Sequence, residues 1–163
     1  MHIYINNKFI SYNNYKAKCA VGKRGISIKK KEGDFITPKG TFKIREIFYR
    51  KDRVQNLITR IKKTVIRKNM GWCDDPKSTK YNKLIYFPFK YSAEKLYRRE
   101  NIYDIILVLN FNMNPIKKDK GSAIFIHVAK RKFSPTKGCV ALEKKELRKL
   151  LKALKKNSKI KIC

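Results

Sequence analysis

The fold and the chemistry of this chain depend most on one stretch, Phe125-Ile126-His127 followed after a short loop by Ser134-Pro135-Thr136-Lys137-Gly138-Cys139-Val140. His127, one of only 2 histidines, lies in an apolar alternating run that predicts a strand. Cys139 follows Pro135 and Gly138, which break regular structure and predict a tight loop with exposed backbone N–H groups. A thiol needs a base or a positive field to become a thiolate, and an oxyanion needs N–H donors. The stretch therefore predicts a cysteine-nucleophile acyl-transfer site.

Residue types alone leave simpler interpretations open. A lone cysteine is often a small buried hydrophobe, and a lone histidine on a strand often has a structural role. Local Cys and His patterns do not transfer between families, so the pair needs support from elsewhere in the chain.

That support comes from a resemblance. The stretch resembles the signature of the L,D-transpeptidase family (the YkuD-type catalytic domain), which is a histidine, a loop, Ser/Thr-x-Gly-Cys and an apolar residue. An upstream segment, Asp34-Phe35-Ile36-Thr37-Pro38-Lys39-Gly40-Thr41-Phe42, is similar to that family's Asp-x-x-Thr-Pro-x-Gly-x-Phe segment. The blocks Gly71-Trp72-Cys73-Asp74-Asp75-Pro76 and Tyr81-Asn82 resemble a divergent branch of it. The resemblance covers roughly residues 15 to 155.

Two departures from the family pattern bear on the substrate. Many members carry His before the Gly-Cys pair and Asn or Arg two residues after the cysteine, where this chain has Lys137 and Ala141. It also reads His127-Val128-Ala129 in place of the His-Gly-Thr that often begins the motif. The reaction class stays the same, whereas the substrate and the choice between transfer and hydrolysis stay open.

The resemblance implies a mainly β fold, a single β-sandwich-like domain over residues 1–163 with a C-terminal helix. It also implies an L,D-transpeptidase in which Cys139 attacks a peptidoglycan stem peptide, forms a thioester and passes the acyl group to another stem, with His127 as the base. Release to water would make the same site an L,D-carboxypeptidase, and a cysteine hydrolase of another amide is a further alternative. Neither a metal nor an organic cofactor is expected.

Several other residues are candidates for the site. The backbone N–H groups of Gly138 and Cys139 are the expected oxyanion donors, and Thr136, favoured over Ser134, would position the loop or orient the imidazole. Lys137 is one of several loop cations that would favour the thiolate if they lay close to it. The expected lining of the substrate cleft consists of Trp72, Tyr81 and Phe125.

The pattern of apolar residues predicts mostly strands. Alternating or β-branched runs predict strands at His2–Ile5, Lys8–Tyr12, Lys16–Val21, Thr41–Tyr49 and Ala123–Val128. The continuous apolar run Asp104–Phe111 predicts a central strand buried on both faces. Lys159–Ile162, with alternating lysines, predicts an edge strand.

One clear helix and one ambiguous segment complete the secondary structure. Leu147, Leu150, Leu151 and Leu154 follow the i, i+3, i+4, i+7 spacing of a helix face. Residues 50–69 carry Val54, Leu57, Ile58 and Ile61 on one helical face, which would make a basic amphipathic helix or lid. A solvated excursion is the favoured interpretation there.

The composition is strongly basic. The 42 Lys+Arg against 12 Asp+Glu leave a net charge of +30, spread along the chain. A binding surface for nucleic acid or an anionic polymer is one interpretation, and a non-enzymatic basic binding module is the main rival function. Codon bias explains the charge more simply, because Lys, Asn, Ile, Tyr and Phe are all abundant while Ala and Gly are scarce, as an AT-rich genome would give. We therefore expect no obligate nucleic-acid partner, although electrostatic contact with anionic envelope polymers stays open, and we expect a monomer.

The remaining compositional signals concern metals, disulfides and location. Cys19, Cys73, Cys139 and Cys163 show no C-x-x-C spacing, so neither a zinc knuckle nor a disulfide framework is expected. A metal site formed by Cys73, Cys139 and His127 stays open, although no further metal-binding ligand is obvious. No signal peptide and no segment long enough to span a membrane are visible. The resemblance implies the cell envelope or periplasm, and a cytoplasmic location stays open.

Overall fold

A computed structural model describes all residues from 1 to 163, and it is mainly β with one short α-helix near the C-terminus. The strands are β1 (His2–Ile5), β2 (Phe9–Tyr12), β3 (Tyr15–Ala20), β4 (Ile26–Ser27), β5 (Thr37–Pro38), β6 (Gly40–Tyr49), β7 (Lys63–Val65), β8 (Met70–Cys73), β9 (Leu84–Tyr86), β10 (Ala93–Lys95), β11 (Ile105–Leu109), β12 (Phe125–Val128), β13 (Val140–Leu142) and β14 (Lys159–Ile162). The helices are α1 (Lys144–Ala153) and the 3₁₀ turns η1 (Asn101–Tyr103) and η2 (Arg131–Phe133).

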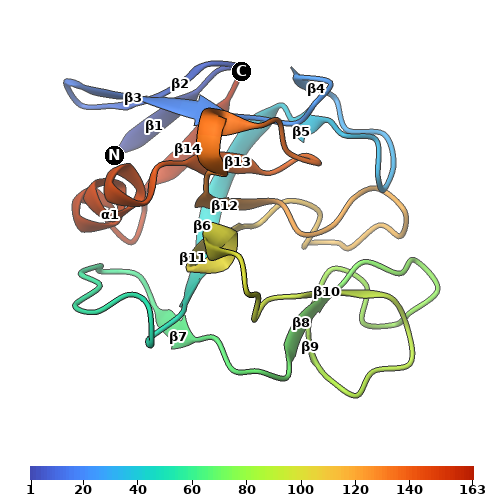
Figure 1. The fold of residues 1–163 in the computed structure, drawn as a ribbon. Helices are drawn as coiled ribbons and strands as arrows, with labels where there is room; N and C mark the ends of the chain where they lie inside the picture. The colour runs from blue at the N-terminus through green and yellow to red at the C-terminus, as the bar shows by residue number, and fades with distance from the viewer.

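The main sheet closes on itself. Its strand order is β11-β12-β13-β3-β2-β1-β14-β6-β7, and β11 also pairs with β6, so the strands from β11 round to β6 form a ring. The long strand β6 bonds to β11 along one stretch and to β14 along another, which gives a sandwich-like barrel. Both chain ends lie in the upper part of Figure 1, where β1 runs parallel to β14.

The interior of the ring is the main core. Strand side chains alternate between faces, and Ile3 and Ile5 of β1 accordingly point inward with no exposed surface. All five residues of β11 are buried. The helix α1 turns Leu147, Leu150 and Leu151 towards the same core, as their helical spacing predicts. The mainly β architecture with a C-terminal helix is thus confirmed.

A second cluster lies outside the ring. The short strands β8, β9 and β10 form a small sheet that lies at the lower right of Figure 1, away from α1. An outer cluster forms between this small sheet and the outward-facing side chains of β6, β11 and β12; its larger members are Phe48, Trp72, Leu96, Tyr103, Ile106 and Phe125. The functional site described below borders this outer cluster.

Two expectations from the sequence are wrong. The strand Lys159–Ile162 is central, because it pairs with β1 on one side and β6 on the other, and is no edge strand. Residues 50–69 form no helix and are not simply solvated: Val54 and Leu57 pack into the main core, whereas Ile58 is 63% exposed. No helix in the chain has the length and apolar character needed to cross a bilayer.

Candidate active site

Two parallel strands bring His127 and Cys139 together. In the pairing of β12 with β13, Ile126 lies opposite Val140 and His127 opposite Ala141. Cys139 directly precedes β13, so it lies beside Phe125. Because same-register residues of paired strands share a face, the side chains of Cys139 and His127 both lie on the outer face of the ring. Phe125 and Cys139 accordingly contact the outer cluster.

The Cys139 thiol has two backbone partners. Its Sγ donates to the carbonyl oxygen of Ala123 at 3.1 Å and accepts from the N–H of Phe125 at 3.5 Å. Burial, together with the negative charge of Glu94, raises the pKa of Cys139 to about 12, and the positive charge of Lys29 works in the opposite direction. The Cys139 side chain is therefore a protonated thiol near neutral pH.

His127 is held as a neutral base. Its Nδ1 lies 2.9 Å from the carbonyl oxygen of Val128; since a carbonyl only accepts, Nδ1 carries the proton and Nε2 is left as the acceptor. The ring of Tyr103 packs edge-to-face on the imidazole at 5.4 Å. Burial lowers the pKa of His127 to about 4, so the imidazole stays uncharged near neutral pH.

Two threonines hold the backbone of the nucleophile. Thr136 Oγ1 donates to the carbonyl oxygen of Cys139 at 2.5 Å, and Thr37 Oγ1 donates to the same oxygen at 3.4 Å. Thr37 belongs to the upstream motif and Thr136 to the downstream one. The two motifs are therefore joined at the peptide that follows the nucleophile.

One of the two expected oxyanion donors is already engaged. The N–H of Gly138 donates to Thr136 Oγ1 at 3.1 Å, which corrects the expectation that it is free. The N–H of Cys139 has no acceptor among the backbone and side-chain hydrogen bonds of the chain. Cys139 N–H is thus the donor available to a developing oxyanion.

The three aromatic residues expected to line a cleft are buried. Trp72, Tyr81 and Phe125 are 4%, 1% and 0% exposed. Trp72 and Phe125 pack edge-to-face at 5.4 Å, while the Tyr81 hydroxyl donates to Glu32 Oε2 at 2.5 Å and accepts from the N–H of Gly121 at 2.9 Å. These residues are part of the buried surroundings of the site and do not form an open surface.

The remaining candidates lie at the surface. Ser134 and Lys137 are exposed and make no hydrogen bond, so the structure does not bring them to the thiol. No group of three or more His, Cys, Asp or Glu side chains is placed to hold a metal ion.

Sequence reasoning missed a residue that fixes the thiol's acceptor. Asn82 Oδ1 accepts from Trp72 Nε1 at 3.0 Å and from the N–H of Ala123 at 3.1 Å, and its Nδ2 donates to the carbonyls of Phe111 and Asn112. Ala123 has a φ of 50°, a backbone angle that residues other than glycine rarely adopt. The only sequence signal was the place of Asn82 in the Tyr81-Asn82 pair.

A second missed group lies on the small sheet. Glu94 of β10 accepts from the Tyr103 hydroxyl at 2.6 Å, with Arg98 at 3.5 Å. Through Tyr103 this carboxylate is linked to both His127 and Phe125. No motif pointed to Glu94, although a carboxylate is uncommon in a chain with only 12 Asp+Glu.

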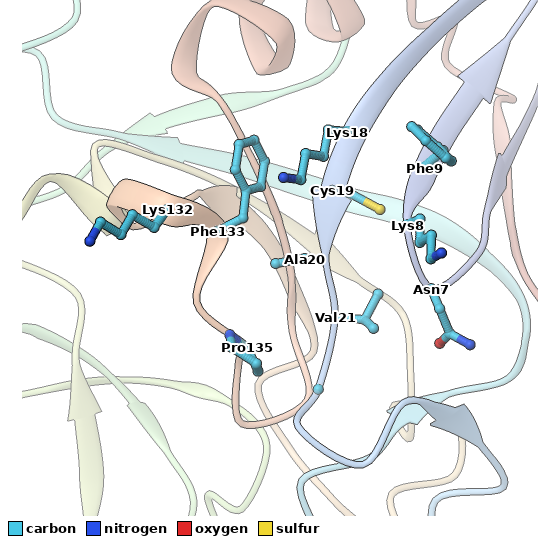
Figure 2. Close-up of a pocket in the computed structure, with 11 residues that line it drawn as sticks. Asn7, Lys8, Phe9, Lys18, Cys19, Ala20, Val21, Lys132, Phe133 and Pro135 are labelled. Atoms are coloured by element: carbon cyan, nitrogen blue, oxygen red, sulfur yellow. The ribbon is translucent and has the colours of Figure 1, made fainter.

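A surface pocket of about 440 Å³ lies elsewhere (Figure 2). Strands β2 and β3 form one side of it and the segment from Lys132 to Pro135 the other. It contains Cys19, whose pKa burial raises to about 12 and whose Sγ is 3.5 Å from the carbonyl oxygen of Asn6. No histidine lines this pocket, so it lacks the base that Cys139 has.

Comparison with known protein families finds a match. A family model described as the L,D-transpeptidase catalytic domain matches residues 1–162, almost the whole chain. No curated protein has a significant match to the sequence.

Proposed function

Because the chain belongs to the L,D-transpeptidase catalytic-domain family, whose members are cysteine-dependent and act on peptidoglycan stem peptides, we propose that it transfers an acyl group between stem peptides with Cys139 as nucleophile and His127 as base. The observation that carries the proposal is the register of β12 and β13, which puts the thiol and the imidazole on one face. The hydrogen bond from His127 Nδ1 to Val128 supports it, since it leaves Nε2 as the proton acceptor.

In the first half-reaction, Cys139 Sγ attacks the carbonyl carbon of the amide between the L-centre of a diamino acid and a terminal D-residue. The thiol proton passes to His127 Nε2 as the S–C bond forms, and the carbonyl oxygen becomes an oxyanion beside the Cys139 N–H. The C–N bond then breaks, and His127 returns the proton to the leaving amine. A thioester remains on Cys139.

In the second half-reaction, a side-chain amine of another stem attacks the thioester carbonyl. His127 takes a proton from that amine, the C–S bond breaks, and the proton goes to the thiolate. The products are a crosslink and the free Cys139 thiol. We place this reaction in the cell envelope, where the polymer lies.

The neutral resting pair fits general-base chemistry. With the pKa of Cys139 raised to about 12 and that of His127 lowered to about 4, the thiol keeps its proton until a substrate is attacked. The thiol proton is therefore transferred as the S–C bond forms, and no thiolate–imidazolium pair exists before the substrate is attacked.

The test is incubation of the protein with a disaccharide-tetrapeptide that contains meso-diaminopimelate, with products followed by mass spectrometry. We expect a crosslinked dimer from the wild type and none from Cys139→Ser. Cys19→Ser is the matched control, since Cys19 lies in the separate pocket of Figure 2, and it should behave as wild type. A Cys139-dependent tripeptide without dimer would mean hydrolysis, and dimer formation by Cys139→Ser would overturn the proposal.

A further inference from the structure

Lys29 is a buried cation at the nucleophile loop. It lies between β4 and β5, and its side chain is only 2% exposed. Its Nζ lies 2.5 Å from Asp34 Oδ1 and 3.4 Å from the carbonyl oxygen of Ile36. A buried ammonium is costly unless it is paired and hydrogen-bonded, so such a lysine needs a specific reason in a chain with many surface cations.

Asp34 fixes where Lys29 points. Asp34 Oδ1 also accepts from the N–H of Ile36 at 3.1 Å, and Oδ2 accepts from the N–H groups of Lys30 at 2.9 Å and Lys31 at 3.3 Å. These bonds lower the pKa of Asp34 to about 2, with the Lys29 bond the largest favourable cause against the opposing effect of burial. The carboxylate is therefore charged and immobile, and it holds the ammonium in one direction.

Two glycines lie near Lys29, and one of them makes room for its stem. A Cβ on Gly121 would overlap the Lys29 stem. A Cβ on Gly138 would lie 2.9 Å from the carbonyl oxygen of Ile36 and 3.6 Å from Lys29 Nζ. Gly121 precedes Ala123, the acceptor of the thiol proton, by two residues, and Gly138 directly precedes Cys139. The Lys29 stem therefore packs against Gly121, and its ammonium lies near Gly138, so Lys29 lies close to both backbone segments that hold the thiol.

We propose that Lys29, held by Asp34, is a positioning residue for the Cys139 nucleophile: its stem sets residues 121–123 against residues 136–139, and its ammonium places positive charge beside the thiol. The proposal rests on the proposed function only in taking Cys139 as the nucleophile. Neither Lys29 nor this arrangement is part of the Ser/Thr-x-Gly-Cys signature.

The thiol is surrounded by charged and titratable groups from four elements. They are Lys29 and Glu32 from the segment between β4 and β5, Glu94 from β10 and Tyr103 from η1; the fourth element, β12, carries His127 on the same face of the ring as the thiol. Glu94 and Glu32 raise the pKa of Cys139, and Lys29 lowers it. Removing Lys29 and removing Glu94 should therefore change thiol reactivity in opposite directions.

The experiment measures the rate at which iodoacetamide alkylates Cys139, followed by peptide mass spectrometry at several alkaline pH values where the fold is retained. We expect Lys29→Met to slow alkylation at least about threefold at fixed pH, and Glu94→Gln to accelerate it by a similar factor. Lys30→Met is the matched control, because it removes an exposed lysine side chain from the same segment. Its alkylation rate should equal that of the wild type.

Lys29→Gln guards against a folding defect, since its amide keeps an N–H donor for Asp34 while it removes the charge. It should slow alkylation as Lys29→Met does. A wild-type alkylation rate in Lys29→Gln would overturn the proposal. Changes of the rate in the same direction for Lys29→Gln and Glu94→Gln would overturn it too, because they would indicate a general loss of packing around the thiol. The outcome is separable from the proposed function, because alkylation needs no stem peptide. A wild-type rate in Lys29→Gln overturns the Lys29 proposal alone, whereas turnover by Cys139→Ser would remove Cys139 as the nucleophile and overturn both.

Discussion

Cys139 Sγ donates its proton to the carbonyl oxygen of Ala123 at 3.1 Å, across the gap between β12 and the nucleophile loop. In the resting site the thiol is therefore bonded to backbone, and it must turn from Ala123 to attack. The strength of this bond depends on where the Ala123 peptide is held. Asn82 holds Ala123 from its amino side, because Asn82 Oδ1 accepts from the N–H of Ala123 at 3.1 Å.

Asn82→Ala should weaken both stability and activity. The buried indole N–H of Trp72 and the N–H of Ala123 would lose their common acceptor, which costs about 2–4 kcal/mol of unfolding free energy. Trp72 is the only tryptophan, so its fluorescence reports the local change directly during urea unfolding. Asn69→Ala, at an exposed asparagine without a side-chain hydrogen bond, should stay within about 0.5 kcal/mol of wild type. Equal stability of the two variants would contradict the role given to Asn82.

The acid limb of activity should lie well below the usual histidine range. Because burial lowers the pKa of His127 from 6.5 to about 4, the base stays neutral and competent through mildly acidic pH. A profile of kcat/KM against pH should fall only as pH approaches about 4. His2→Gln, at an exposed residue of β1, should leave the profile unchanged. An acid limb near 6.5 would show that His127 is solvated during turnover.

The buried imidazole of His127 also makes the free energy of unfolding depend on pH. Between about 4 and 6.5 the unfolded chain binds the His127 proton and the folded chain does not, so stability falls as pH drops through this window. His127→Gln should show a smaller loss of unfolding free energy over that window. Urea titrations of wild type and variant at several pH values measure the difference, and parallel pH dependences would contradict the burial of a neutral imidazole.

The strands and the helix could be predicted from local patterns, because each carries its own periodicity. The alternation of Ile3 and Ile5 and the spacing of Leu147, Leu150 and Leu151 follow directly from burying one face. The central position of β14 could not be predicted, since it depends on pairing with β1 at the other end of the chain. The prediction for residues 50–69 failed for the same reason, because Val54 and Leu57 are buried by contacts that no local period encodes.

The sequence pointed to His127 and Cys139 as the candidate pair, whereas their surroundings could not be predicted from it. His127 and Cys139 lie in one short stretch with a recognisable motif, so their chemistry is visible in the sequence. Lys29 is one of 42 Lys+Arg residues, and only the folded chain shows that it is the one placed between Gly121 and Gly138. Glu94 likewise reaches the site because the small sheet covers the outer face, a relation between distant segments.

Asp34→Asn should destabilise the fold by about 3 kcal/mol at neutral pH, because it removes one partner of a buried ion pair and puts an amide against backbone donors. The pKa of Asp34 is lowered from 3.8 to about 2, so the stabilisation is fully present above 3.8 and is lost as pH falls towards 2. The difference between wild type and variant should therefore shrink over that window. Asp119→Asn, at an exposed carboxylate, is the control and should match wild type in urea unfolding.

Gly138→Ala should lower the catalytic rate, because it displaces the backbone next to Cys139. Gly138 has a φ of 138°, and an added Cβ would lie 2.9 Å from the carbonyl oxygen of Ile36, so the backbone next to Cys139 must move. A displacement of about 1 Å in a reacting group can cost up to about a hundredfold in rate, and we expect kcat/KM to fall at least about tenfold. Gly33→Ala is the matched control: its φ of 69° is also left-handed, but no atom lies within 4 Å of the added Cβ. That variant should lose about 1 kcal/mol of stability to backbone strain and keep its turnover, because Gly33 faces open space. If both variants lose turnover alike, the strain of a left-handed residue explains the effect; if only Gly138→Ala does, the contact with Ile36 sets the position of the nucleophile.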